Sequence, residues 1–160
     1  MSRTIKLETI IAAPAETCFD LSRNLDLHLA TQTRAREKAI GGKREGLIGY
    51  GESVTWQATH FMARLQMTVT ITGMDRPFYF KDEMVRGPFL SMSHRHTFHQ
   101  IGDRTVMRDE FTYQVPFGFL GRWFDRLILN KYLSKVLTER NAFIRLIAES
   151  GQQNEFLNTK

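Results

Sequence analysis

A histidine and an aspartate could form a reactive centre in this chain, because two neighbouring segments place them face to face. Residues 92–101 and 105–115 alternate between apolar and polar side chains with period two, as half-buried strands do. With Gly102-Asp103 as a two-residue turn, counting back pairs His96 with Asp109 on the apolar face. Ionisable groups are costly to bury unless they are partnered or line a wet cavity, so this pair needs an explanation.

The outer face of the same hairpin supports this register independently. It pairs Arg95 with Glu110, and opposite charges directly across two strands stabilise the pairing. A register shifted by one residue would instead turn Arg95, Arg108 and Glu110 into the interior. We therefore expect His96 opposite Asp109.

Three roles for the pair stay open. It could be a satisfied buried hydrogen bond in which the carboxylate fixes the imidazole tautomer. It could lie on a wet cavity wall and orient the polar end of a ligand. It could also be a general base with its orienting group, as an aldol cyclisation or dehydration requires. In that case Tyr113, on the same strand face as Asp109, would donate to the enolate oxygen.

A metal site is the fourth possibility. His94 and His96 share a strand face, and Asp109 or His60 could add a ligand. A mononuclear site needs three converging protein ligands with an ordered second shell, and the glutamate expected downstream of a His-x-His site is missing. The sequence therefore predicts no metal and no cofactor.

The remaining histidines and the cysteine are expected to be chemically quiet. His28 and His99 fall at positions typical of the surface. Cys18 lies on the apolar face of a predicted helix, which indicates an inert core thiol.

The composition is ordinary for one globular domain. The chain has 160 residues, 42% hydrophobic and 24% charged, which is enough for a core of its own. We expect one domain over residues 1–150 and a mobile polar tail over 151–160. A single cysteine excludes an intrachain disulfide, and neither a signal peptide nor a long apolar run is apparent. The sequence thus predicts a cytoplasmic protein without stable membrane insertion.

The net charge of +5 indicates a solvated basic surface. The basic residues are scattered along the chain and are not interleaved with aromatic side chains. No recognition-helix, zinc-finger or RNA-binding-strand motif is present, so no nucleic-acid partner is expected.

Hydrophobic periodicity predicts a mixed fold with its helices at the two ends of a run of strands. The expected elements are a strand at 5–11, helices at 14–24 and 25–31, strands at 52–60, 64–72, 78–85, 92–101 and 105–115, and a helix at 117–150. The last helix carries two apolar stripes on opposite sides, one of them Leu120, Trp123, Phe124 and Leu127. We prefer a kink or break near 128–131 to a helix buried on both sides.

This α+β order resembles the helix-grip fold of the START and plant-allergen-like (SRPBCC) superfamily, especially its polyketide cyclase/dehydrase-like bacterial members. The fold is a curved antiparallel sheet wrapped around a long C-terminal helix, with two short helices after strand one. The residues that carry the resemblance are APAETCFDL at 13–21, GESVTW at 51–56, RPFYFKDE at 76–83, GPF at 87–89, and the segment 105–116 that leads into the helix.

The resemblance implies a cavity between the sheet and the long helix that binds an apolar or aromatic small molecule. Inward-facing aromatic and flexible side chains are consistent with an adaptable pocket of this kind. The residues expected to line it are Trp56, Met67, Phe78, Phe80, Met84, Met92, His94, His96, Phe98, Met107, Asp109, Phe111, Tyr113, Phe124 and Ile128.

The resemblance leaves more than one function open, because a fold does not fix an activity. A binding protein without catalysis is the leading hypothesis. The alternatives are a cyclase/dehydratase-like enzyme that uses His96, Asp109 and Tyr113 on a polyketide-type carbonyl compound, and an interaction protein that acts beside an epimerase-like reductase. A homodimer is left open.

Overall fold

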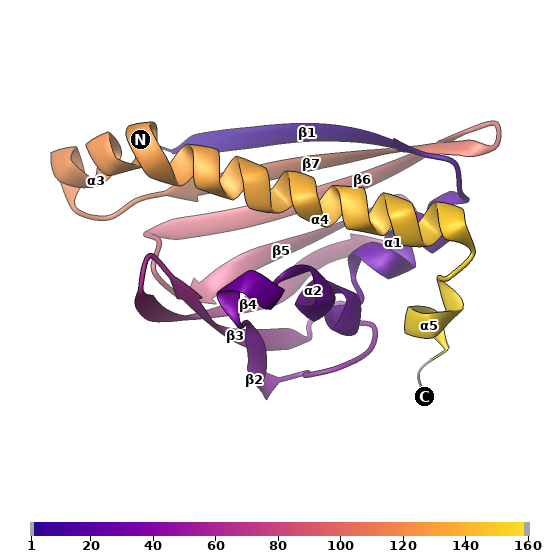
Figure 1. The fold of residues 1–160 in the computed structure, drawn as a ribbon, viewed down its shortest axis with the longest axis horizontal. Coiled ribbons are helices and arrows are strands. Elements are labelled where there is room, and N and C mark those ends of the chain that lie inside the picture. Colours follow the sequence, from indigo (N-terminus) through magenta and orange to yellow (C-terminus); the bar gives the residue numbers. More distant parts are fainter. Residues whose placement is uncertain (1, 159–160) are drawn as a thin grey trace.

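A computed structural model describes residues 2–158, apart from the side chain of Arg34, as one curved antiparallel sheet wrapped around a long helix (Figure 1). The elements in chain order are β1 (Arg3–Ile11), α1 (Ala15–Ser22), α2 (Leu25–Thr31), a 3₁₀ turn (Thr33–Ala35), β2 (Lys38–Gly42), β3 (Ser53–His60), β4 (Ala63–Asp75), β5 (Tyr79–Arg86), β6 (Ser91–Ile101), β7 (Arg104–Gln114), α3 (Gly118–Phe124), a π-helical segment (Asp125–Leu129), α4 (Asn130–Ser150) and α5 (Asn154–Leu157).

The sheet has seven strands in the order β1-β7-β6-β5-β4-β3-β2, and each neighbouring pair is antiparallel. Consecutive strands from β2 to β7 are joined as a meander, and β1 closes the far side by pairing with β7. The helix α4 lies along the concave side, in contact with β1, α1 and α2. The expected helix-grip architecture is therefore confirmed.

The β6–β7 hairpin has the register that the alternation predicts. His96 pairs with Asp109, and Arg95 pairs with Glu110 on the outer face. Burial alternates along both strands, because every second side chain points into the concave interior. Gly102, at the turn, has a φ of 59°, a left-handed conformation that glycine adopts without steric cost.

One end of the interior is a packed aromatic core beneath α1. Phe19 is fully buried and meets the rings of Phe80 and Phe98 edge to face, each with a centroid separation of 5.4 Å. Burying one such ring stabilises the fold by about 2 kcal/mol. Met107 is fully buried at the same place, where its sulfur contacts the Ser22 hydroxyl.

The long helix has an irregularity next to the position that we expected, but it is a π-helical segment and not a break. A π-helical segment at Asp125–Leu129 joins α3 to α4, so the helical turns continue from one to the other. Its wider turn shifts the phase of the side chains, which accounts for two apolar stripes that do not align. The first stripe is not buried, however: Leu120, Trp123 and Leu127 are exposed on α3 and the π-helical segment.

The sequence predicts a mobile polar tail after Gly151, but the structure has a short helix in this segment. Residues 154–157 form α5, and Phe156 and Leu157 pack against the core. The side chain of Asn24 connects this segment to α2: its Oδ1 accepts from the Leu27 amide at 2.8 Å, and its Nδ2 donates to the Phe156 carbonyl at 2.9 Å. Residues 159–160 lie outside the described residues. No helix within residues 2–158 is long and apolar enough to cross a membrane.

Candidate functional site

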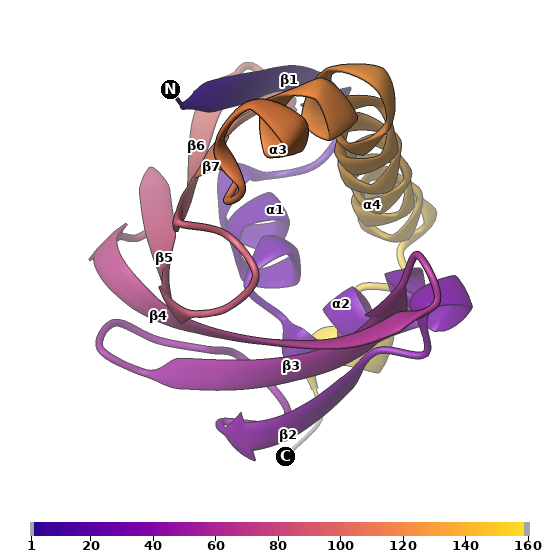
Figure 2. The same ribbon diagram turned by 90° about the vertical axis from the view of Figure 1, so that its left-hand side faces the viewer.

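A cavity of about 390 Å³ lies between the concave face of the sheet and α4. Figure 2 looks along the barrel-like space that the sheet and α4 enclose, from the end that carries α3. The cavity wall is mainly apolar, with side chains such as Trp56, Met92 and Phe111 from the sheet and Leu133 and Val136 from α4. A partly enclosed cavity of this size and lining is typical of small-molecule sites.

Eight of the fifteen side chains expected at the cavity do line it. They are Trp56, Met67, Phe80, Met92, His94, His96, Phe111 and Phe124. All but Phe124 come from inward-facing positions of β3 to β7, so the period-two pattern located them.

The other seven lie elsewhere, for separate physical reasons. Phe78 precedes β5 and is 61% exposed, and Ile128 points outward from the π-helical segment. Phe98 and Met107 face inward but are covered by α1, so they belong to the packed core. Met84 packs beside the backbone of Gly87 at the end of β5. Asp109 and Tyr113 lie behind the cavity wall, as described below.

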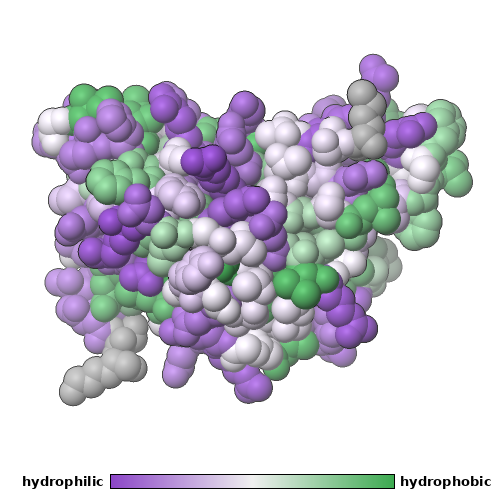
Figure 3. Space-filling view, turned by 180° about the vertical axis from the view of Figure 1, so that it is seen from behind, coloured by the Kyte–Doolittle hydropathy of each residue, from purple (hydrophilic) through white to green (hydrophobic). Residues whose placement is uncertain are grey.

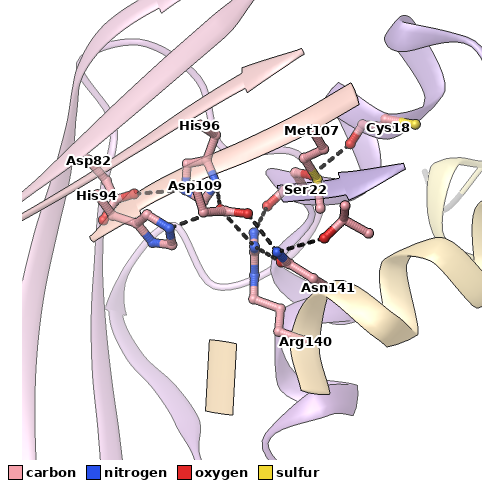
Figure 4. Close-up of polar contacts among 10 residues, drawn as sticks. Cys18, Ser22, Asp82, His94, His96, Met107, Asp109, Arg140 and Asn141 are labelled. Atoms are coloured by element: carbon pink, nitrogen blue, oxygen red, sulfur yellow. Dashed lines mark hydrogen bonds and ion pairs between the residues drawn. The ribbon is translucent and has the colours of Figure 1, made fainter. Parts of the chain in front are cut away.

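A buried polar cluster forms one side of the cavity, and Asp109 is at its centre (Figure 4). Its Oδ1 accepts a hydrogen bond from His94 Nε2 at 3.0 Å, and its Oδ2 accepts one from Asn141 Nδ2 at 2.6 Å. The Arg140 guanidinium lies 3.8 Å from Oδ1 and donates to the Ser22 carbonyl at 2.7 Å. These contacts tie β6 and β7 to α4 and α1.

His96 lies between two carboxylates. Its Nδ1 is 2.7 Å from Asp109 Oδ1, and its Nε2 is 3.4 Å from Asp82 Oδ1. The Nδ1 atom nevertheless has no hydrogen bond of normal geometry among the described residues. The predicted register is thus confirmed. The hydrogen bond of normal geometry to Asp109, however, comes from His94 and not from His96.

Asp82, Arg140 and Asn141 belong to this cluster, and the sequence analysis missed all three. Asp82 pairs with His94 across β5 and β6, and it has the same parity along its strand as Phe80. The alternation could therefore have found it. Arg140 and Asn141 are buried on α4, and no local pattern marks a helical Arg-Asn pair as inward-facing.

The charges of the cluster are set by burial and by its own hydrogen bonds. Burial lowers the pKa of His94 to about 4, so this imidazole is neutral near neutral pH. Burial opposes ionisation of Asp109, but the hydrogen bond from His94 and the close approach of the His96 imidazole outweigh it and hold the pKa of that carboxyl well below its usual value. The pKa of Asp82 is also lowered, because its contact with His96 outweighs burial.

The tautomer of His94 follows from these charges. An ionised Asp109 can only accept, so His94 Nε2 carries the hydrogen of the bond between them. In a neutral imidazole the other nitrogen, Nδ1, is then a hydrogen-bond acceptor. Both His94 and the carboxylate of Asp82 line the cavity. The polar side of the cavity therefore offers acceptors from these two residues, beside the Arg140 guanidinium, which also lines the cavity.

Tyr113 is not placed to act with Asp109. Its hydroxyl donates to Asp125 Oδ1 at 2.5 Å and accepts from Asn130 Nδ2 at 3.2 Å, both at the start of the long helix. Asp125 is in turn paired with Arg3 at 2.8 Å. Burial raises the pKa of Tyr113 to about 12. The hydroxyl therefore connects β7 to the helix.

The other histidines are engaged away from the polar cluster. His28, expected on the surface, lines the cavity, stacks on Trp56 with a centroid separation of 4.4 Å, and contacts Glu37. His60 Nδ1 lies 2.6 Å from the Tyr132 hydroxyl. His99 is exposed, as expected.

The thiol of Cys18 is fully buried, and burial raises its pKa to about 11. At neutral pH it is therefore a protonated thiol, which is a poor nucleophile. This agrees with its interpretation as a core residue.

Within residues 2–158, Asp82, His94 and His96 are the side chains that could hold a metal ion, with potential ligand atoms within 4.8 Å of one another. His60, which we considered as a ligand, is not among them. The Arg140 guanidinium beside Asp109 already supplies positive charge to the two carboxylates. The residues are thus arranged as a charge-balanced hydrogen-bonded network, which disfavours a further cation.

The fold occurs in many solved structures at low sequence identity. The protein TTHA0849 from Thermus thermophilus superposes with a TM-score of 0.70 at 14% identity, over 89% of this chain and 97% of that chain. Major latex-like protein 151 from Panax ginseng gives 0.63 at 14% identity, covering 92% and 97%. A START superfamily protein from Mycobacterium smegmatis gives 0.63 at 13% identity, covering 87% and 97%. The sequence matches no protein-family model and no curated protein.

Proposed function

We propose that this protein binds an apolar or aromatic small molecule that carries a hydroxyl group. The observation that supports this best is a mainly apolar cavity of about 390 Å³ with a polar cluster on one side. The apolar wall would bury the body of the ligand, and burial of apolar surface supplies most of the binding free energy. The cluster would orient its polar end.

The acceptors of the cluster determine which polar group fits. His94 and Asp82 both line the cavity, and His94 Nδ1 and the Asp82 carboxylate are acceptors, so we expect a ligand hydroxyl to donate to one of them. A ligand carboxylate would be repelled by the Asp82 carboxylate, and the Arg140 guanidinium, which also lines the cavity, is already engaged by the Ser22 carbonyl and Asp109. We therefore propose a neutral hydroxyl, phenolic or aliphatic, and not an acid.

Titration calorimetry with a matched pair of compounds tests this. We expect 2-naphthol to bind at least about tenfold more tightly than 2-methoxynaphthalene, because the ether lacks the donor and leaves buried acceptors unpaired. Asp82→Asn should reduce this preference, because it replaces one carboxylate oxygen by an amide donor. Equal affinity for the two compounds would exclude recognition of a hydroxyl.

A cavity-filling variant tests the location. Val136→Trp places an indole in the cavity and should abolish binding, whereas Thr138→Trp, on the exposed side of α4, should not. Folding of each variant is checked by its thermal melting curve. Undiminished binding to Val136→Trp would place the ligand elsewhere.

We do not extend the proposal to the cyclase/dehydratase alternative. Asp109 is behind the cavity wall, and the Tyr113 hydroxyl donates to Asp125, so the expected base and enolate donor do not face a common substrate position. No contact of the described residues supports the alternative of a reductase partner.

A further inference from the structure

Exposed apolar side chains gather at one end of the molecule, where the cavity reaches the surface. We define the mouth surface as Met62, Leu90, Phe119, Leu120, Trp123 and Leu127, all large hydrophobic residues that are exposed. They come from the β3–β4 turn, the β5–β6 loop, α3 and the π-helical segment. Figure 2 shows this end, and Figure 3 shows hydrophobic residues gathered at it, on the right. So large an apolar surface marks an interaction site.

The mouth surface surrounds the cavity opening. Residues next to its members line the cavity: Phe61 beside Met62, Phe89 beside Leu90, and Phe117 and Phe124 on either side of the exposed α3 residues. The Phe61 ring contacts Phe124 at a centroid separation of 5.4 Å, so the β3–β4 turn and α3 meet over the cavity. Whatever covers the mouth surface therefore also faces the route into the cavity.

The β3–β4 turn holds Met62 outward at a conformational cost. Phe61 and Met62 have φ values of 50° and 65°, the two positive angles of a hairpin turn that Asn and Gly adopt most readily. Met62 is nevertheless 99% exposed. Phe61 packs on Phe124, but Met62 has a strained backbone and an exposed apolar side chain, which suggests selection for contact with something outside the protein.

The exposed charged side chains in the segments that carry the mouth surface are all basic. Residues 59–66, 85–93 and 113–132 contain five basic residues, Arg64, Arg86, Arg122, Arg126 and Lys131, all exposed. Their one acidic residue is Asp125, which is buried and paired with Arg3 at 2.8 Å. An apolar surface with an interfacial tryptophan and a basic rim is complementary to an anionic lipid membrane.

We propose that the mouth surface docks on the surface of an anionic lipid membrane, with the cavity opening toward the lipid. The apolar side chains would enter the interface between headgroups and acyl chains, and Arg122 and Arg126 would lie at the level of the lipid phosphates. This binding is peripheral and reversible, because no helix of the described chain spans the bilayer. An apolar molecule could then pass between membrane and cavity without crossing water.

Co-sedimentation with vesicles tests the docking. We expect the protein to bind vesicles of phosphatidylcholine with about one third phosphatidylglycerol, and to bind pure phosphatidylcholine vesicles much less. Arg122→Gln with Arg126→Gln should weaken binding about 25-fold, from about a fivefold loss for each arginine. Trp123→Ser should weaken it at least about tenfold, and added salt should weaken the wild type.

A double variant at the opposite end is the matched control. Ile101→Ser with Arg104→Gln removes one exposed apolar and one exposed basic side chain from the β6–β7 turn, and it should leave vesicle binding unchanged. Equal losses in this control and in the Trp123 variant would overturn the proposal. So would a folded wild type that fails to bind the anionic vesicles.

Two further outcomes separate the alternatives. If Trp123→Ser converts a dimer into a monomer in analytical ultracentrifugation, a second copy covers the mouth surface and the docking proposal fails. The docking does not rest on the proposed ligand: Val136→Trp fills the cavity and should still bind vesicles. Failure of the ligand proposal and failure of docking can therefore be told apart.

Discussion

Replacing His94 by glutamine should remove a large part of the acid sensitivity of this fold. His94 is buried beside Asp109, and burial lowers its pKa from about 6.5 to about 4. In the unfolded chain the same imidazole takes up a proton near its ordinary pKa. Between these two values the unfolded state binds more protons than the native state, so stability falls as the pH falls.

The magnitude follows from the two pKa values. Above about pH 6.5 the imidazole is neutral in both states and contributes no pH dependence. At about pH 5 most unfolded chains carry the extra proton and few native molecules do, which costs about 2 kcal/mol of unfolding free energy. The cost approaches about 3 kcal/mol near pH 4, where the native imidazole begins to titrate.

Urea unfolding at about pH 7 and about pH 5 measures this loss. Glutamine keeps an amide donor that can reach Asp109 but cannot take up a proton. Between the two pH values the free energy of unfolding of His94→Gln should therefore fall by about 2 kcal/mol less than that of the wild type. His99→Gln is the matched control on the same strand, since His99 is exposed. The same loss in wild type and His94→Gln would refute the assignment of a buried neutral imidazole.

Two other variants test the contacts that join the helices to the sheet. Asp109→Asn removes the charge that Arg140 faces in the interior and should cost about 3 kcal/mol in urea unfolding, while Asp103→Asn, in the exposed turn, should cost almost nothing. Equal effects would mean that the buried charges are not coupled. Asn24→Ala should cost about 1–2 kcal/mol through loss of the α2 cap and the bond to Phe156. Asn24→Asp keeps the cap acceptor and loses only the bond to Phe156, so faster proteolysis after Gly151 in both variants would confirm that this bond holds α5. Resistance equal to the wild type would contradict it.

Most of the sheet could be predicted because the pattern that specifies each strand lies within the strand itself. In a strand the side-chain direction reverses at each residue, so alternation along 92–101 and 105–115, with Gly102 at the turn, determines the β6–β7 register. The pairing of His96 with Asp109 follows from that register alone. The same parity marks Asp82 as inward-facing beside Phe80, although we did not use it.

The sequence of a strand does not show which element packs against its inward face. Phe98 and Phe111 are both inward-facing, but Phe98 lies under α1 in the packed core and Phe111 lines the cavity. Periodicity gives the direction of a side chain and says nothing about the element opposite it. The division of the interior into core and cavity therefore depends on where α1 lies.

The sequence by itself determined the helix-grip order, the register of the hairpin and the inward direction of His94, His96 and Asp109. Only the tertiary structure decided that Arg140 and Asn141 complete the polar cluster, and that the apolar stripe with Leu120 and Trp123 is exposed. The reason is that a helical stripe looks the same in sequence whether a sheet, solvent or a membrane lies against it. Its partner is set by the π-helical segment and by where the sheet ends.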